Sequence, residues 1–331
     1  MVTRVNRTDL VIERHTAATA DGWQLELKCT YSPSHLRVAG RPVLIIPGYG
    51  MNSFIFGFHP RGTSMERCLA EAGFEVWSAN LRAQGTTRRR QAGAPGPSLR
   101  AYAEHDLTSL TAAVLASTRA SRDAVDLVGC SLGGSIAYAH LALCPDARVH
   151  GLITIGAPLR MVGVHPLLRR AFASPWLAGK LVLRGTRRMM RVGAPVLARF
   201  PSALSIYMNA SHVDLSVIGE MIETVEDPNP RVNKDIAHWI NAGDLVLRGV
   251  NVTQHLKKID LPLLVVVSNR DGIVPEPANL SVTDAWGGRD VEVLRVGDER
   301  EWYAHADLFI GDDAPRRVFA PIAEWLRARS A

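Results

Sequence analysis

Short apolar runs alternate along this chain with longer segments whose apolar residues recur every three or four positions. The apolar runs lie at 43–46, 74–81, 124–128, 149–155, 263–267 and 291–296. Runs of this length are typical of parallel strands that are buried on both faces. Segments with helical spacing, such as 63–72 and 100–118, lie between them. The alternation predicts an α/β fold with a mostly parallel, doubly wound sheet.

The first part of the chain has a different pattern, because residues 9–32 alternate between apolar and polar positions. Asp21-Gly22 divides this stretch into two segments, and this pair favours a tight turn. We therefore expect a β-hairpin that forms the antiparallel edge of the sheet.

The strand pattern stops after residue 158 and resumes near residue 253. Residues 159–252 contain helical segments interrupted by proline and glycine. We interpret this stretch as a helical cap inserted into a core made of residues 1–158 and 253–331. The chain has 331 residues and 47% hydrophobic content, which is enough to bury a core of that size.

Charge is unevenly distributed, although the net charge is only +6. No acidic residue occurs from 147 to 213, whereas this stretch contains ten basic ones: Arg148, Arg160, Arg169, Arg170, Lys180, Arg184, Arg187, Arg188, Arg191 and Arg199. Large apolar residues lie between them. One interpretation is a cap whose arginines are solvated or paired with the acidic residues of 214–244; the other is contact with a lipid surface or an apolar substrate. No nucleic-acid-binding module is recognisable, so we expect no nucleic-acid partner.

The sequence also indicates a cytoplasmic location. No run of 18 uncharged apolar residues occurs, and the amino terminus lacks the apolar region of a secretory signal. Cys29, Cys68, Cys130 and Cys144 show no metal-binding spacing, and we interpret them as reduced thiols. We expect neither a metal nor an organic cofactor.

A candidate nucleophile lies at the centre of the strongest motif, Gly129-Cys130-Ser131-Leu132-Gly133. A strand precedes it and a helix follows, as in a nucleophile elbow, where glycines leave room for a sharp turn. Ser131 is therefore expected at the carboxyl edge of the sheet, with the Leu132 N–H as an oxyanion donor. The loop Pro47-Gly48-Tyr49-Gly50 follows another strand, and we nominate the Tyr49 N–H as the second donor.

Chain order selects the other catalytic candidates, because this motif requires serine, then an acid, then histidine, each after a successive strand. His305 is the only one of the eleven histidines that follows Asp271. The other position for the acid, after the strand that ends at Ile155, holds no carboxylate. We predict that Ser131 attacks an acyl carbonyl, His305 transfers its proton and Asp271 orients the imidazole. Asp307 is interpreted as a helix cap or a loop brace.

These residues bring out a resemblance to a known superfamily. The segments LIIPGYGMNS, GFEVWSANLRAQG, GCSLGG, NRDGIVP and HADLFIG resemble those of α/β-hydrolase fold enzymes, in the branch of the acid lipases and polyhydroxyalkanoate synthases. The resemblance covers roughly residues 40–158 and 258–326 and implies a serine esterase or lipase. Two positions depart from it: Pro47 stands where the acid lipases usually have histidine, and Ser131 stands where the synthases have cysteine.

The expected function is hydrolysis of a carboxylic ester, with an apolar acyl chain, through an acyl-serine intermediate. A small-molecule ester is then the expected partner. A serine acyltransferase or a thioesterase would use the same three residues. An α/β-hydrolase fold that only binds a partner is the alternative from another class.

Overall fold

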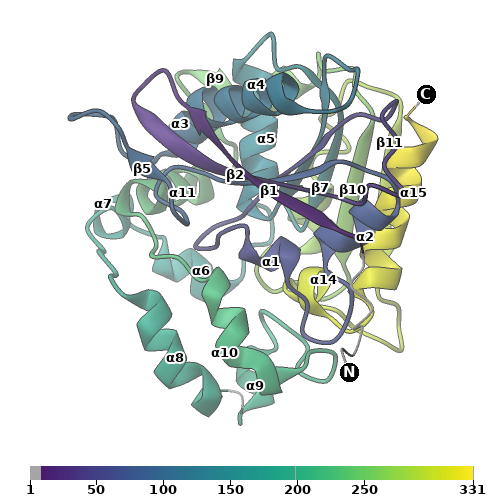
Figure 1. Ribbon diagram of the computed structural model, residues 1–331. Coiled ribbons are helices and arrows are strands. Elements are labelled where there is room, and N and C mark those ends of the chain that lie inside the picture. The colour runs from purple at the N-terminus through teal and green to yellow at the C-terminus, as the bar shows by residue number, and fades with distance from the viewer. Residues whose placement is uncertain (1–8, 198, 331) are drawn as a thin grey trace, which may run out of the picture.

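One large sheet with helices on both faces forms the centre of the molecule, in a computed structural model that describes residues 9–197 and 199–330 (Figure 1). Its strands are β1 (Val11–Ala18), β2 (Trp23–Tyr31), β3 (Val43–Ile46), β4 (Val76–Asn80), β6 (Val125–Cys130), β7 (Val149–Ile155), β10 (Leu263–Ser268) and β11 (Val291–Val296). Their order in the sheet is β1-β2-β4-β3-β6-β7-β10-β11. From β4 to β11 all neighbours are parallel. The expected fold class is confirmed.

The hairpin at the start of the chain is also confirmed. Strands β1 and β2 pair antiparallel, with Ala18 opposite Gln24, and Gly22 between them has a φ of 94°. Glycine suits that turn because it has no side chain to clash at positive φ. The hairpin lies at the sheet edge, where a short strand, β5 (Arg88–Arg89), also pairs with β2.

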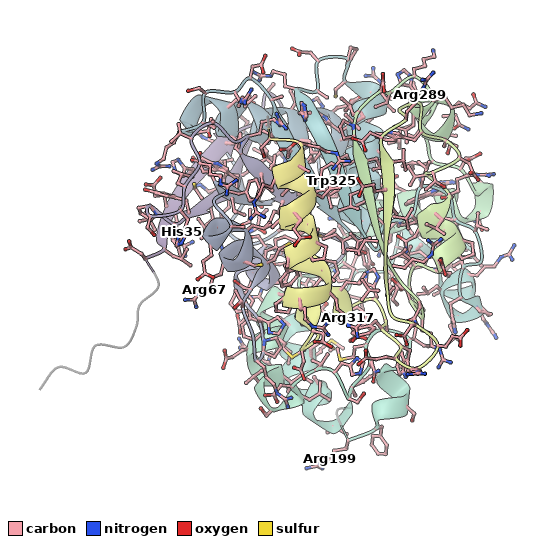
Figure 2. All side chains as sticks on the ribbon, turned by 90° about the vertical axis from the view of Figure 1, so that its right-hand side faces the viewer. His35, Arg67, Arg199, Arg289, Arg317 and Trp325 are labelled. Carbon is pink, nitrogen blue, oxygen red and sulfur yellow. The ribbon has the colours of Figure 1, made fainter. Side chains whose placement is uncertain are left out.

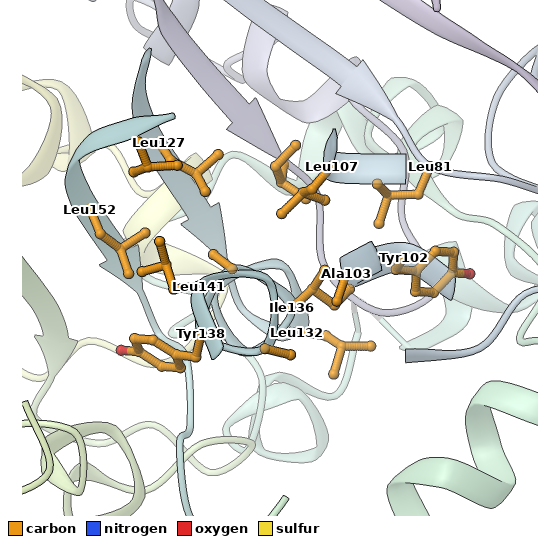
Figure 3. Packing of buried hydrophobic residues seen from close by; sticks show 14 of the residues in the cluster. Leu81, Tyr102, Ala103, Leu107, Leu127, Leu132, Ile136, Tyr138, Leu141 and Leu152 are labelled. Atoms are coloured by element: carbon orange, nitrogen blue, oxygen red, sulfur yellow. The ribbon is translucent and has the colours of Figure 1, made fainter. Parts of the chain in front are cut away.

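Helices α4 (Leu107–Ser117), α5 (Leu132–Leu143) and α12 (Val252–Leu256) cover one face of the sheet. Figure 3 shows Ile136 and Leu141 of α5 in one cluster with Leu127 and Leu152 of the sheet and Leu107 of α4. Leu127 and Leu152 are fully buried there, against Ile136 and Leu141 of α5. This packing fixes α5, and with it the turn that begins the helix.

The opposite face is covered by α1 (Phe54–Gly57), α2 (Met65–Glu71), α14 (Asp307–Ile310) and α15 (Ala320–Ala328). Figure 2 shows α15 lying along this face, with Trp325 near its carboxyl end. Val128 and Ile153 pack into this second core. Neighbouring residues of one strand therefore enter different cores, as expected for a strand buried on both sides.

The predicted helix at 100–118 differs from a regular helix. A single α-helical turn, α3 (Leu99–Ala101), leads into a π-turn at Tyr102–Asp106, and α4 follows. The π-turn contains Asp106, whose buried carboxylate accepts hydrogen bonds from the backbone N–H and the Nε–H of Arg82, each at 2.9 Å. Periodicity does not reveal a contact of this kind, which depends on a distant residue.

Helix α13 (Glu276–Leu280) follows β10. Residues 159–252, between β7 and β10, form mainly short helices. They are α6 (Pro166–Ala171), α7 (Pro175–Ala178), α8 (Thr186–Leu197), α9 (Pro201–Leu204), α10 (Ile218–Met221) and α11 (Pro230–Ala242). Proline at the first position of α6, α7 and α11 explains these starts, because proline lacks the N–H that is unpaired there. The expectation of helices alone is incomplete, since β8 (Val246–Leu247) and β9 (Val250–Asn251) form a small hairpin.

The four cysteines are free thiols, and Cys130 is fully buried. Across residues 9–197 and 199–330, no helix has the length and apolar character needed to cross a bilayer. Residues 1–8, on which the expectation of a missing secretory signal depends, lie outside the described residues.

Candidate active site

Ser131 lies at the turn between β6 and α5, as the motif predicts. Its φ of 52° and ψ of −124° are strained for a residue with a side chain. No residue with a side chain fits at the glycine on either side of Ser131. A Cβ at Gly129 would lie 2.4 Å from the Cα of Gly134, and a Cβ at Gly133 would lie 2.5 Å from the carbonyl oxygen of Ile46. The turn therefore forms only because these positions lack side chains.

The three residues selected by chain order meet at this turn. The Oγ of Ser131 lies 2.9 Å from Nε2 of His305, and Nδ1 of His305 lies 2.6 Å from Oδ2 of Asp271. All three are buried. In the tautomer that donates Nδ1–H to Asp271, Nε2 is free to accept the serine O–H.

Asp271 is held by its own loop. Its Oδ1 accepts the backbone N–H of Ile273 at 2.8 Å and of Val274 at 2.7 Å. The second oxygen, Oδ2, is then directed at His305. Two backbone donors and an imidazole thus fix the orientation of the carboxylate.

The loop that contains His305 is held by a carboxylate two residues later. Asp307 accepts the N–H of Ala304 at 2.7 Å and the N–H of Asn209 at 2.9 Å. Burial raises the pKa of Asp307 to about 7, while the N–H groups of Ala304 and Asn209 oppose this shift. The interpretation as a loop brace is confirmed, but Asp307 does not cap α14, which begins without a side-chain cap.

The two proposed oxyanion donors lie beside Ser131. Leu132 is the first residue of α5, and Tyr49 lies in the glycine-containing loop after β3. Gly48 allows that loop to approach, because a Cβ there would lie 2.8 Å from the Cβ of Ser131. In the part of the chain that the structure describes, neither the Tyr49 N–H nor the Leu132 N–H has a hydrogen-bond acceptor. Both N–H groups are therefore available to a ligand.

A cavity of about 300 Å³ opens beside these groups. Its walls include Ser131, His305, Tyr49 and Leu132 together with apolar side chains from distant segments: Met161, Val164, Leu168, Phe172, Ile236, Trp239, Ile240, Ile273, Val274, Phe309 and Ile310. Apart from His305, no described residue in its walls is acidic or basic. Its size and apolar character suit a small ligand with a hydrocarbon part.

The sequence did not identify the residues of these walls. Leu168 and Phe172 are four positions apart on and just after α6, and Ile236 and Ile240 have the same spacing on α11. Such spacing indicates one apolar helix face, but it does not reveal that the face lines a cavity. Among the described residues, no three His, Cys, Asp or Glu side chains gather in a way that would hold a metal ion.

Solved structures share this fold at low sequence identity. An esterase from Thermogutta terrifontis has a TM-score of 0.63 and 19% identity, with 96% of this chain and 100% of that chain covered. An esterase from a Rhodococcus species has a TM-score of 0.61 and 19% identity, with 95% of this chain and 98% of that chain covered. A bromoperoxidase from Bacillus anthracis has a TM-score of 0.60 and 17% identity, with 96% of this chain and 100% of that chain covered. At such identities the likeness establishes the fold alone.

A family model provides the more specific relationship. The model of Hydrolase_4, described as serine aminopeptidase, S33, matches residues 60–296, which is more than two thirds of the chain. The match includes Ser131 and Asp271 and ends before His305. No curated protein sequence matches the chain. With the sheet order and the family match in agreement, the chain belongs to the Hydrolase_4 family of α/β-hydrolase fold proteins.

Proposed function

We propose that the protein is a carboxylic-ester hydrolase that acts through an acyl-serine intermediate. The observation that carries this proposal is the hydrogen-bond chain from Ser131 through His305 to Asp271, located at an apolar cavity. A serine, an imidazole and a carboxylate in this order activate the hydroxyl as a nucleophile. The family is one of hydrolases, which agrees with this chemistry.

Each residue has a defined role in the proposed reaction. His305 accepts the proton of Ser131 at Nε2 as the Oγ attacks the ester carbonyl carbon. The N–H groups of Tyr49 and Leu132 donate to the oxyanion of the tetrahedral intermediate. His305 then protonates the leaving alcohol. A water molecule then loses a proton to His305 and attacks the acyl carbon. The bond between this carbon and the Oγ of Ser131 breaks, and His305 returns the proton to the Oγ as the acid leaves. Asp271 stabilises the imidazolium in both steps.

The cavity supports an ester with an apolar acyl chain. Transfer of a methylene group from water into an apolar cavity is favourable by about 0.8 kcal/mol. A peptide substrate with a free amino terminus fits less well, because its ammonium group would be desolvated without a carboxylate partner among the described wall residues. We therefore favour esterase over aminopeptidase activity, although the family description names the latter.

We also propose that residues 159–252 act as a cap on a core of residues 1–158 and 253–331. Met161, Leu168, Phe172, Trp239 and Ile240 all belong to this segment and line the same cavity as Ser131. The cap would then determine the depth of the acyl site.

A fluorophosphonate probe and a series of p-nitrophenyl esters test the proposal. We expect labelling of the wild-type protein, no labelling of Ser131→Ala, and a preference for medium or long acyl chains over acetate. Absence of labelling in the wild type, or equal labelling of Ser131→Ala, would support a binding protein instead. An added alcohol or thiol that outcompetes water for the acyl group would identify an acyltransferase. A preference for acyl thioesters over the matching oxygen esters would identify a thioesterase.

A further inference from the structure

The exposed large apolar residues of this protein are concentrated in one segment. Twelve of the seventeen in the described residues lie between 162 and 207: Val162, Leu167, Trp176, Leu177, Leu181, Val182, Leu183, Met189, Val192, Val196, Phe200 and Tyr207. Leu167 is 64% exposed and Trp176 is 63% exposed. A large group of exposed apolar side chains on a protein surface indicates contact with another apolar surface. We refer to residues 162–197, 199 and 200 as the cap surface.

Helix α8 exposes large apolar side chains on one face and holds paired arginines on another. Arg187 and Arg191, four positions apart, form ion pairs with Glu223, and Arg187 also pairs with Glu226. Met189, Val192 and Val196 occupy a different face of the helix and are exposed. Surface helices normally direct their apolar side inward and their charged side toward water. In α8 the paired arginines and the buried Ala194 face the protein, whereas Met189, Val192 and Val196 are presented outward.

Unpaired cations accompany these apolar residues. Six exposed basic residues of the cap surface form no ion pair within the described part of the chain: Arg169, Arg170, Lys180, Arg184, Arg188 and Arg199. Lys180 contacts the ring of Trp176 at 3.8 Å. Figure 2 shows Arg199 at the end of the molecule remote from Trp325. The cap surface therefore combines apolar side chains with positive charge and, over residues 162–200, contains no acid.

This surface is connected to the cavity through α6. Leu168 and Phe172 line the cavity. Leu167, next to Leu168 in the chain, is exposed on the cap surface. The helix is thus a wall with the cavity on one side and solvent on the other. A molecule held at the outer side of α6 is separated from the cavity by this helix.

We propose that the cap surface docks on an anionic lipid surface, from which the ester substrate enters the cavity. The identity of the substrate rests on the proposed esterase function, whereas the docking does not. Apolar side chains flanked by arginine and lysine suit the boundary between acyl chains and anionic head groups. A second copy of the chain fits less well, because a twofold contact would bring the same unpaired cations together.

Co-sedimentation with vesicles tests the docking without any need for catalysis. The Ser131→Ala protein is mixed with vesicles of phosphatidylcholine, or of equal parts phosphatidylcholine and phosphatidylglycerol. We expect sedimentation with the anionic vesicles only, and release at about 0.5 M NaCl, where charge interactions are screened. Binding by this variant is independent of whether Ser131 is a nucleophile, so a failure of docking is distinguishable from a failure of the esterase proposal.

Two double variants locate the surface. Arg184→Glu with Arg188→Glu reverses unpaired charge, and Met189→Gln with Val192→Gln removes exposed apolar side chains from α8. Each is expected to lower the partition coefficient by about tenfold or more. Ile12→Gln on β1 and Arg289→Glu are the matched controls, and both should bind like the parent protein. Ile12 and Arg289 are exposed, and Figure 2 shows Arg289 at the end of the molecule opposite Arg199. Hydrolysis of a soluble short-chain ester should not change, because none of these residues lines the cavity.

Three outcomes would overturn the proposal. The first is absence of sedimentation with anionic vesicles. The second is equal loss of binding in the control variants, which would show that the cap surface is not the site. The third is a concentration-dependent dimer in analytical ultracentrifugation that Met189→Gln with Val192→Gln abolishes, which would identify a second copy as the occupant.

Discussion

The carboxylate of Asp307 accepts the backbone N–H of Asn209 at 2.9 Å, across a separation of 98 residues. The same segment forms two further contacts with the candidate site: the Gly272 N–H donates to the carbonyl of Ile206, and the Ala306 N–H donates to that of Tyr207. Residues 206–209 thus join the loop of Asp271 to the loop of His305. The alignment of the three catalytic candidates depends on this segment as well as on their own loops.

The ionisation of Asp307 gives a pH dependence of stability. Its pKa is about 7 in the folded protein, mainly because of burial, against about 3.9 in an unfolded chain. A raised pKa favours the neutral acid in the folded state, so this stabilisation is complete below about pH 4 and is lost as the pH rises through about 7.

Asp307→Asn removes that titration. The unfolding free energy of the wild type minus that of the variant is expected to fall by roughly 4 kcal/mol from pH 4 to pH 8, because only the wild type loses this stabilisation. Urea unfolding at a series of pH values measures it. Burial also raises the pKa of Asp106, to about 6, but that contribution is common to both proteins and cancels. Parallel pH profiles would contradict the assignment.

His305→Ala and Asp271→Asn are expected to lower kcat by about 10⁴-fold each, because one removes the base and the other its orientation. Steady-state hydrolysis of a p-nitrophenyl ester measures the loss. Circular dichroism and thermal melting should show that both variants remain folded. Near-full activity of Asp271→Asn would mean that another residue supplies the acid.

Gly133→Ala is expected to abolish most activity, by about 10²-fold or more, because its Cβ would lie 2.5 Å and 2.7 Å from the backbone oxygens of Ile46 and Pro47. These atoms belong to the sheet and to the loop of Tyr49, so they cannot move without disturbing the site. Gly219→Ala is the control, since nothing lies within 4 Å of its added Cβ. Equal kcat/KM values for the two variants would refute the steric argument.

Ile240→Trp is expected to shift the ester preference toward short chains, because a larger side chain on α11 fills part of the cavity. For octanoate, kcat/KM should fall by about tenfold or more, while acetate changes by about twofold at most. Val246→Trp, on the exposed strand β8, serves as the control. An unchanged chain-length profile would place the acyl chain elsewhere.

Arg82→Ala is expected to destabilise the fold by about 3–5 kcal/mol, because it leaves the buried carboxylate of Asp106 without its partner. Arg82 is fully buried and also pairs with Asp21 at 2.7 Å. Urea denaturation measures the loss. Arg90→Ala, at an exposed arginine of the nearby loop, should be neutral, and a similar effect of both variants would argue against the buried pair.

Much of the fold could be predicted because its signals are local. The apolar runs identify the buried strands, since a strand covered on both faces has no polar side. The turn at Ser131 is encoded within five residues, because only glycine fits at Gly129 and Gly133. Asp271 and His305 follow from chain order, since parallel strands bring the loops after their carboxyl ends to one edge of the sheet.

Tertiary structure alone decided the features that join distant segments. The bond between Asp307 and Asn209, the π-turn around Asp106 and the walls of the cavity all depend on how separate elements pack. The same holds for α8, whose periodicity marks an apolar face but not that this face is directed toward solvent. A sequence specifies which residues share a face of an element, whereas the element's neighbours determine what that face contacts.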